Sequence, residues 1–152
     1  MTKSAYDSAL RLLARREHSA KELADKLKQR HFVPEEIQQA LIKCQQFNYQ
    51  SDERFAEQLY NVRVRQGYGP LRIQQELQAK GIDTNLSDAV LQQESTDIWA
   101  QRAHAVMMKK FSEEQTSAWD DWQKCVRFLM YRGFPMELIM ALRNSQQKIR
   151  CE

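Results

Sequence analysis

The sequence predicts an all-α fold: an elongated, curved array of three tandem three-helix repeats, each similar to a helix-turn-helix unit. Three observations support this prediction. The 152 residues are rich in helix-forming residue types and include only four glycines and three prolines. A short motif recurs at nearly constant spacing. Every glycine and proline falls at a junction between two expected helices, where these residues commonly end or begin helices.

The recurring motif is a basic residue, then His or Gly, then a hydrophobic residue. Its middle position is His31, Gly81 or Gly133. A basic residue followed by Gly is typical of a helix C-terminus, where Gly adopts the left-handed conformation. Apolar residues occur four and eight positions earlier, which places them on one buried helix face. These residues are Leu23, Leu27, Ile73, Leu77, Cys125 and Leu129.

Each repeat is expected to begin and to end with a further amphipathic helix, which the apolar spacing again identifies. The apolar positions of the first helices are Ala5, Ala9, Leu12 and Leu13, then Phe55, Leu59 and Val62, then Trp99, Ala103, Val106 and Met107. Those of the third helices are Phe32, Ile37, Ala40 and Leu41, then Ile82, Leu86, Ala89 and Val90, then Phe134, Leu138, Ala141 and Leu142.

Capping signals support several of these helices. Ser19 and Glu22 have the spacing of a capping box at the start of the second helix of repeat 1. Pro70 is expected to open the second helix of repeat 2, and Pro34 and Pro135 the third helices of repeats 1 and 3. The turns between helices are therefore short, and such units gain a core by stacking on their neighbours.

The same spacings set the predicted boundaries. Repeat 1 covers residues 1–46, repeat 2 covers 47–94, repeat 3 covers 95–145, and 146–152 is a tail. The stretch from the first helix to the cap is eight residues longer in repeat 3 than in repeat 2, because Trp99 to Gly133 spans 34 positions and Phe55 to Gly81 spans 26. We expect the polar stretch 112–117 to be a longer loop that holds this insertion.

Composition restricts the class of function. A net charge of +3 is too small to imply nucleic-acid binding by itself. Cys44, Cys125 and Cys151 are scattered and form no CxxC pair, so we expect no disulfide framework, no zinc site and a cytoplasmic location. The first residues lack a long apolar run, so neither a signal peptide nor a membrane contact is expected.

No residues have the spacing of a catalytic or cofactor site, and the protein is predicted not to be an enzyme. His18, His31 and His104 are dispersed, so no metal site is expected, and His31 has the structural role of a cap. The stretch Gly67-Tyr68-Gly69 lacks the spacing of a nucleotide-binding glycine loop, so no cofactor is expected.

Direct reading of DNA by the short helical turns is weakly supported. The would-be recognition helices carry carboxylates where a DNA reader usually has Arg, Lys, Asn or Gln. These carboxylates are Glu35, Glu36, Asp88 and Glu137. The tryptophans Trp99, Trp119 and Trp122 are all expected in the core rather than on a base-stacking surface.

A basic cluster between residues 54 and 80 is the best candidate for a binding surface. In one interpretation it is a solvated face, in which Glu76 links Arg72 and Lys80 by weak exposed pairs. That does not explain the other three arginines, which have only Glu57 nearby in the sequence. We therefore favour contact with an acidic or phosphate-bearing partner. The cluster comprises Arg54, Arg63, Arg65, Arg72 and Lys80.

The segment RVRQGYGPLRIQQELQAKGI (63–82) resembles the signature of the RecX family, small bacterial regulators of the RecA recombinase. FNYQSDERFAEQ (47–58), FLMYRGF (128–134) and HSAKELADKL (18–27) are similar to its other motifs, in the same order. The resemblance implies three tandem three-helix repeats. It also implies a negative regulator that binds RecA or the RecA–DNA filament and suppresses filament growth, ATP hydrolysis, strand exchange and coprotease activity.

The resemblance further implies a partner-binding role for Arg63, Arg65, Tyr68 and Arg72, within the matched segment. With Arg54 and Lys80 they form the surface predicted to bind the RecA filament, and Tyr68 is either a core wedge or a contact. The expected protein is a monomer that acts in DNA repair, homologous recombination and the SOS response, with weak contact to DNA phosphate as an addition. Two alternatives stay open: a nucleic-acid-binding module that acts without RecA, and a general helical-repeat adaptor. Filament capping and groove insertion are not distinguished.

Overall fold

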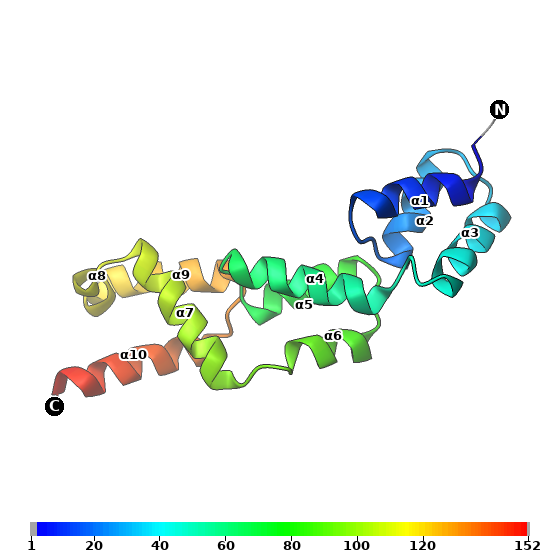
Figure 1. Ribbon diagram of the computed structural model, residues 1–152. Coiled ribbons are helices and arrows are strands. Elements are labelled where there is room, and N and C mark those ends of the chain that lie inside the picture. The colour runs from blue at the N-terminus through cyan, green and yellow to red at the C-terminus, as the bar shows by residue number, and fades with distance from the viewer. Residues whose placement is uncertain (1–2, 152) are drawn as a thin grey trace. The chain divides into compact units, whose positions relative to one another are not determined.

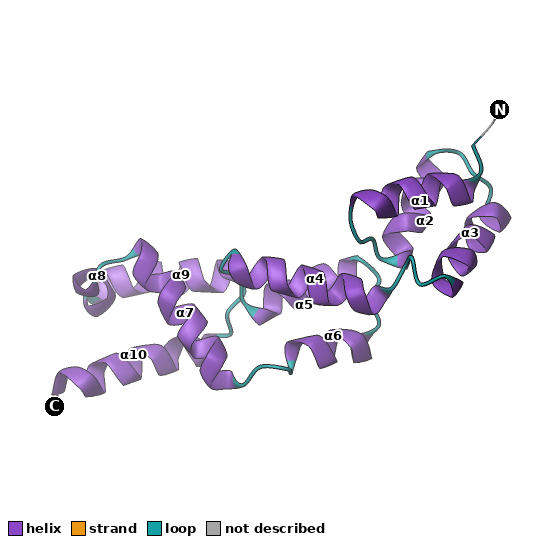
Figure 2. Cartoon of the chain, viewed as in Figure 1, coloured by secondary structure: helices purple, strands orange, loops and turns teal. Residues whose placement is uncertain are grey.

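The structure is a computed structural model that describes residues 3–151, apart from the side chains of residues 117 and 145–151. These residues fold into ten α-helices joined by turns, with no strand among them (Figures 1 and 2). The helices are α1 (Ala5–Arg15), α2 (Ala20–Gln29), α3 (Pro34–Gln46), α4 (Asp52–Arg65), α5 (Pro70–Ala79), α6 (Thr84–Leu91), α7 (Thr96–Lys110), α8 (Glu113–Ser117), α9 (Trp119–Arg132) and α10 (Met136–Cys151). The predicted all-α class is confirmed.

The chain forms two compact units. Unit 1 consists of Met1–Leu59 and Glu76–Val90, and unit 2 of Tyr60–Gln75 and Leu91–Glu152. Helices α4 and α5 therefore each contribute residues to both units.

The core of unit 1 is built where α1, α2 and α3 pack on one another (Figure 1). Side chains from all three helices meet in it, at the apolar positions that helical periodicity predicts. The buried members are Ala5, Ala9, Leu12, Leu23, Leu27, Ile37, Ala40 and Cys44.

The recurring motif ends helices as predicted. His31, Gly81 and Gly133 all have positive φ angles, of 69°, 74° and 98°. A left-handed residue after the last helical turn is the conformation that Gly accepts without strain, and His31 adopts it without being Gly. The six apolar residues four and eight positions earlier are all fully buried, with 0% exposure.

The buried face of α4 agrees with the predicted one at Phe55, which is buried, and differs from it further along the helix. Leu59 and Val62 are only half-buried, whereas Ala56 and Tyr60 are buried. Tyr60 packs edge-on against Trp99, with ring centroids 6.0 Å apart, and its hydroxyl accepts a hydrogen bond of 2.9 Å from Arg102 Nη1. Tyr60 carries a polar hydroxyl, so it was not counted among the apolar positions of the helix. The apolar periodicity therefore did not predict that Tyr60 is buried.

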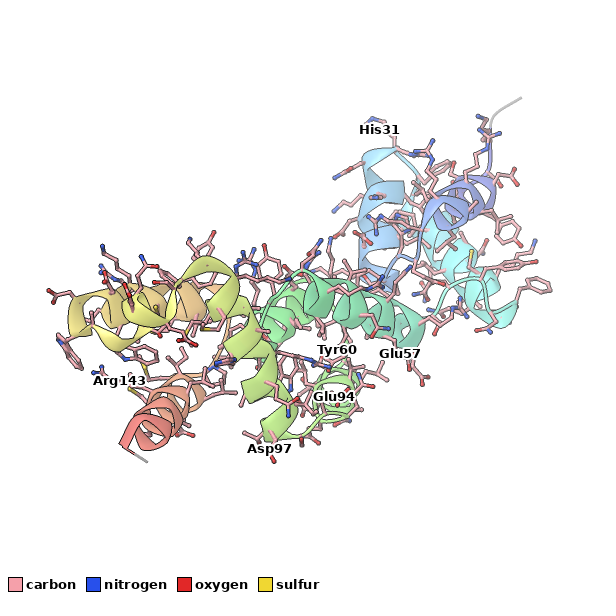
Figure 3. The ribbon with its side chains drawn as sticks, turned by 60° about the vertical axis from the view of Figure 1, so that its left-hand side comes forward. His31, Glu57, Tyr60, Glu94, Asp97 and Arg143 are labelled. Atoms are coloured by element: carbon pink, nitrogen blue, oxygen red, sulfur yellow. The ribbon has the colours of Figure 1, made fainter. Side chains whose placement is uncertain are left out.

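Arg102 completes this packing in unit 2. Its guanidinium lies 4.7 Å from the centre of the Trp99 ring, and its Nη2 is 3.4 Å from Glu94 Oε1. Tyr60 and Glu94 can be followed in Figure 3. The arrangement fixes the first half of α7 to the part of α4 that belongs to unit 2.

Three local predictions need correction. Residues 113–117 are the short helix α8 and not a loop, because Ser112 and Gln115 form a capping box at its start. Ser19 caps α2 as expected, but the carboxylate of Glu22 bonds to Arg16 and Lys80. Trp119 is 61% exposed and so is not a core residue.

Two further predictions concern the chain after residue 132. Pro135 immediately precedes α10, where Ile139 N–H donates to its carbonyl oxygen, so it stands one position before the first helical residue. The predicted tail, 146–152, continues α10 as far as Cys151, and its side chains and residue 152 lie outside the described residues.

Candidate functional site: a ladder of cations and aromatic rings

The Gly67-Tyr68-Gly69 turn docks on the turn between α9 and α10. Gly69 N–H donates a 2.7 Å hydrogen bond to the carbonyl oxygen of Arg132, and Leu71 N–H donates one of 3.0 Å to that of Gly133. Donors at the start of α5 have no partner within their own helix, and the second turn supplies acceptors for them. The two turns are therefore held together by their backbones.

Glycine is required at both contacts. A Cβ atom on Gly69 would lie 2.5 Å from the Gly133 carbonyl oxygen. A Cβ atom on Gly133 would lie 2.5 Å from Arg72 Cβ and 2.6 Å from Arg72 N, at a position that also has a left-handed backbone. No side chain fits these spaces without movement of the backbone. The close approach brings Arg72 beside residues at the end of α9.

Arg72 lies between two tyrosines. Its guanidinium carbon is 4.2 Å from the centre of the Tyr68 ring and 5.5 Å from that of Tyr131. Tyr131 is 75% exposed, so this end of the arrangement faces solvent. A guanidinium over an aromatic face is attracted by the negative charge of that face.

A second guanidinium also lies against the Tyr68 ring and continues the set of cations and rings. The Arg132 guanidinium lies 5.0 Å from the Tyr68 ring and 5.1 Å from the Phe128 ring, and Lys110 Nζ lies 4.4 Å from Phe128. Arg132 Nη1 also donates a 2.8 Å hydrogen bond to the carbonyl oxygen of Gln66, which fixes the arginine in place. We call the whole set the cation–aromatic ladder: Tyr131, Arg72, Tyr68, Arg132, Phe128 and Lys110.

The ladder places three cations on one surface of unit 2. A stacked guanidinium uses its flat face for the ring, while hydrogen bonds are made at its edge, where the N–H groups point. Edge-on N–H groups match the geometry of carboxylate and phosphate oxygens. The arrangement is suited to binding an acidic or phosphate-bearing partner and offers no group with the setting of a nucleophile or general base.

The structure shows where the Tyr68 side chain lies. Its ring is half-buried and stands between the guanidinium groups of Arg72 and Arg132. It is therefore a ring of the ladder and not a core wedge, and its role as a partner contact stays a prediction.

Arg63 and Arg65 lie at the end of α4, in the same unit as the ladder. Arg63 Nη1 donates a 2.8 Å hydrogen bond to Gln66 Oε1, and Arg65 Nε donates one of 3.3 Å to the Asn61 carbonyl oxygen. Both bonds are exposed and local in sequence, and hydrogen bonds of this kind are readily exchanged for bonds to a partner.

Arg54 and Lys80 belong to unit 1, where each is held by an ion pair. Arg54 Nε is 3.0 Å from Glu17 Oε1, and Lys80 Nζ is 2.8 Å from Glu22 Oε2. The expectation that Arg54 has only Glu57 for a counter-charge is therefore wrong, because Glu17 is supplied from 37 positions away. The structure thus gives these two cations a role within the fold.

Glu22 is the centre of this second arrangement. Arg16 donates two hydrogen bonds of 2.9 Å to its carboxylate, and Lys80 donates the third. Burial would raise the pKa of Glu22, but the bonds and charges of Arg16 and Lys80 outweigh burial and lower that pKa to about 2. Next to it, burial lowers the pKa of His18, whose ring lies 3.0 Å from Lys26 Nζ.

Sequence reasoning missed four of the six members of the ladder. Tyr131, Arg132 and Phe128 lie in the motif FLMYRGF, where Arg132 was assigned only as the basic residue of a helix cap. One sequence signal could have indicated these residues: both the Gly67-Tyr68-Gly69 turn and the turn at Gly133 contain glycine, which permits two turns to approach each other closely. Lys110 carries no such signal, since it is a basic residue in the last turn of α7 like many others.

Two absences among the described residues bear on the site. No group of three or more His, Cys, Asp or Glu side chains is placed to hold a metal ion. None of the described helices is long and apolar enough to cross a membrane.

The fold defines a class: a protein of tandem three-helix units, here with a surface of cations and aromatic rings. The comparisons with known proteins identify the family. Models of the first, second and third three-helix domains of RecX match residues 5–44, 51–91 and 97–142, in order along the chain. The chain belongs to the RecX family.

Individual relatives agree. The chain is 52% identical over 139 residues to the regulatory protein RecX of Legionella pneumophila (strain Corby), and the match covers 91% of each. It is 41% identical over 151 residues to the regulatory protein RecX of Haemophilus influenzae (strain PittEE), covering 97% of each. The crystal structure of RecX from Lactobacillus salivarius has the same fold, with a TM-score of 0.81 at 21% identity over 93% of both chains.

Proposed function

We propose that this protein is a negative regulator of RecA that acts in the cytoplasm by binding RecA or the RecA–DNA filament. The observation that carries the proposal is the ordered match of all three RecX domain models over residues 5–142. Binding would suppress filament growth, ATP hydrolysis, strand exchange and coprotease activity, without catalysis by this chain.

The proposed contact surface is the cation–aromatic ladder together with Arg63 and Arg65. It is supported by the accumulation of cations and aromatic rings in unit 2, the composition that protein interfaces favour. Arg54 and Lys80 are left out of this surface, since a partner would have to break their ion pairs with Glu17 and Glu22. A filament repeats the same surface on every protomer, so several weak contacts combine through effective concentration.

Inhibition of RecA ATPase tests this proposal. RecA on single-stranded DNA hydrolyses ATP, and the steady-state rate is followed as this protein is added. We expect the rate to fall at amounts below one molecule per RecA protomer, because a bound regulator stops growth of a whole filament. An unchanged rate at excess protein contradicts the proposal.

A second candidate, a nucleic-acid-binding module that acts without RecA, is favoured by one observation. The alternation of rings and cations also suits single-stranded nucleic acid, whose bases stack on aromatic side chains while its phosphates attract the cations. Fluorescence anisotropy with a labelled oligonucleotide separates the two. Binding to bare DNA as tight as to RecA filaments, with strong salt dependence, supports the second candidate.

A further inference from the structure

Unit 2 contains a pocket that the proposed RecA contact does not use. It lies between α9 and α10, and its volume is about 620 Å³, within the range of ligand-binding pockets. Most of its wall is apolar or aromatic. The lining residues are Trp119, Trp122, Gln123, Val126, Arg127, Met140 and Arg143.

Arg143 is the most unusual member of this pocket. It projects from α10 toward α9 (Figure 3), and its guanidinium carbon lies 4.5 Å from the Trp119 ring and 5.4 Å from the Trp122 ring. Its Nη1 atom is buried and has no hydrogen-bond acceptor among the described residues. An unmatched buried donor costs free energy, and the cost is larger when the group is charged. An acceptor from a partner would remove that cost.

The charges around the pocket indicate the sign of the partner. Two guanidinium groups, those of Arg127 and Arg143, line it, and no carboxylate is among the described lining residues. The apolar residues of the pocket indicate that the partner also carries an apolar group. Trp119 is 61% exposed and Met140 is 40% exposed, so both present apolar surface that an occupant could cover. Trp, Arg and Met are the residue types that binding surfaces favour.

We propose that this pocket binds a peptide segment of a partner protein in which an apolar side chain stands next to a carboxylate. The apolar side chain packs on Trp119, Trp122 and Met140, and the carboxylate accepts a hydrogen bond from Arg143 Nη1. Arg127, at the exposed rim, adds attraction for a negatively charged segment. The proposal does not rest on RecA binding, because the ladder and Arg63 and Arg65 share no residue with the pocket.

The three tryptophans provide a direct readout. Trp119 and Trp122 line the pocket, whereas Trp99 is buried against Tyr60 elsewhere in unit 2. In a ¹⁵N-labelled sample each indole N–H gives its own NMR signal, so Trp99 is an internal control. The probe is the acetylated and amidated peptide Ala-Leu-Asp-Leu-Asp-Ala. Its matched control, Ala-Leu-Asn-Leu-Asn-Ala, has nearly the same shape without the charge.

We expect the acidic peptide to shift the Trp119 and Trp122 signals and to leave that of Trp99 in place. The neutral peptide should bind at least about tenfold more weakly, as expected for loss of a charged hydrogen bond. In Arg143→Gln the two peptides should bind alike. Lys124→Gln, an exposed change on α9 outside the pocket, should keep the tenfold difference.

Several outcomes overturn the proposal. One is equal affinity for the two peptides in the unaltered protein, a comparison that needs no variant to fold. Another is the absence of any shift at Trp119 and Trp122 with about 1 mM acidic peptide, since weaker binding carries no specificity. A third is a shift of these signals with protein concentration alone, which would show that a second copy of this chain occupies the pocket.

Discussion

The two units of this protein hold their cations in different ways. In unit 1, Arg16 and Lys80 converge on the buried carboxylate of Glu22, and Arg54 pairs with Glu17. In unit 2, the cations of the ladder lie against the rings of tyrosine and phenylalanine. A carboxylate neutralises a cation, whereas a ring attracts it and leaves its charge in place.

This difference separates two uses of positive charge. A cation paired with a carboxylate contributes to folding, and its electrostatic attraction for a partner is weak because the carboxylate neutralises its charge. A cation stacked on a ring is positioned, with part of its conformational entropy already lost, and still attracts an anion. Five of the six residues first considered for binding looked equivalent as basic residues in the sequence. The structure pairs Arg54 and Lys80 with carboxylates and places Arg72 against two tyrosine rings.

The largest expected effect comes from breaking the turn that carries the ladder. Gly133→Ala forces a Cβ atom against the backbone of Arg72 at a left-handed position, so we expect unit 2 to lose about 3 kcal/mol of unfolding free energy. Urea denaturation followed by tryptophan fluorescence measures it, because all three tryptophans are in unit 2.

Gly81→Ala is the matched control for this change. Its backbone is also left-handed, but the three atoms nearest to its added Cβ atom all belong to the Lys21 side chain, with Lys21 Cβ and Cδ at 2.9 Å, and none is a backbone atom. We expect a smaller loss of about 1–2 kcal/mol in unit 1, from the backbone conformation and from displacement of Lys21. Equal losses for the two glycines would show that the close approach of the turns is not what position 133 requires.

The next effect tests the carboxylate-held cations. Glu22→Gln removes the charge that Arg16 and Lys80 share, and we expect unit 1 to lose on the order of 2 kcal/mol. Arg16 and Lys80 are about half exposed, so solvent limits the loss. Amide hydrogen exchange in α1–α3 reports it. Glu57→Gln, an exposed change on α4, should alter stability by less than about 0.5 kcal/mol.

Acid should remove the same contribution. The folded-state pKa of Glu22 is about 2, below its ordinary value of 4.5, so its stabilisation is complete above pH 5 and is lost as the pH falls toward 2. The stability difference between the unaltered protein and Glu22→Gln should therefore shrink by roughly a third to a half between pH 7 and pH 3.5. A difference that stays constant over this range would mean that the carboxylate is not held by its two cations.

The smallest effect on stability concerns the middle ring of the ladder. Tyr68→Leu keeps an apolar side chain and removes two ring–cation contacts, with Arg72 and Arg132, so unit 2 should lose about 1 kcal/mol. Tyr49→Leu, which alters an exposed ring in unit 1 that stacks on Phe47, is the control. Inhibition of RecA should weaken in Tyr68→Leu by more than its stability explains, and should not change in Tyr49→Leu.

The fold was predictable because its determinants are local. Helical periodicity and a left-handed cap are written within a few residues, and Leu27, Leu77 and Leu129 are all fully buried where that pattern places them. Trp119 was misassigned because an aromatic residue at a helix start has no local signal that separates core from surface. The short helix α8 was missed because its five polar residues carry no apolar face.

The site was predictable only in part. The segment containing Tyr68 and Arg72 was found by the density of basic residues and by family resemblance. Arg132 bonds to Gln66 across 66 positions of sequence, and no local pattern encodes such a contact. In the same way, the carboxylates that hold Arg54 and Lys80 come from distant positions, so the division of the basic cluster required the structure.

We propose that the cations of unit 2 bind RecA. The most direct test is the RecA ATPase titration with the double reversal Arg63→Glu/Arg65→Glu and the matched reversal Lys28→Glu/Arg30→Glu. Both pairs are basic residues two positions apart at the end of a helix, the first on α4 and the second on α2 in unit 1. We predict that the first variant loses inhibition at low ionic strength while it stays folded, and that the second inhibits like the unaltered protein. Equal inhibition by both folded variants would contradict the account.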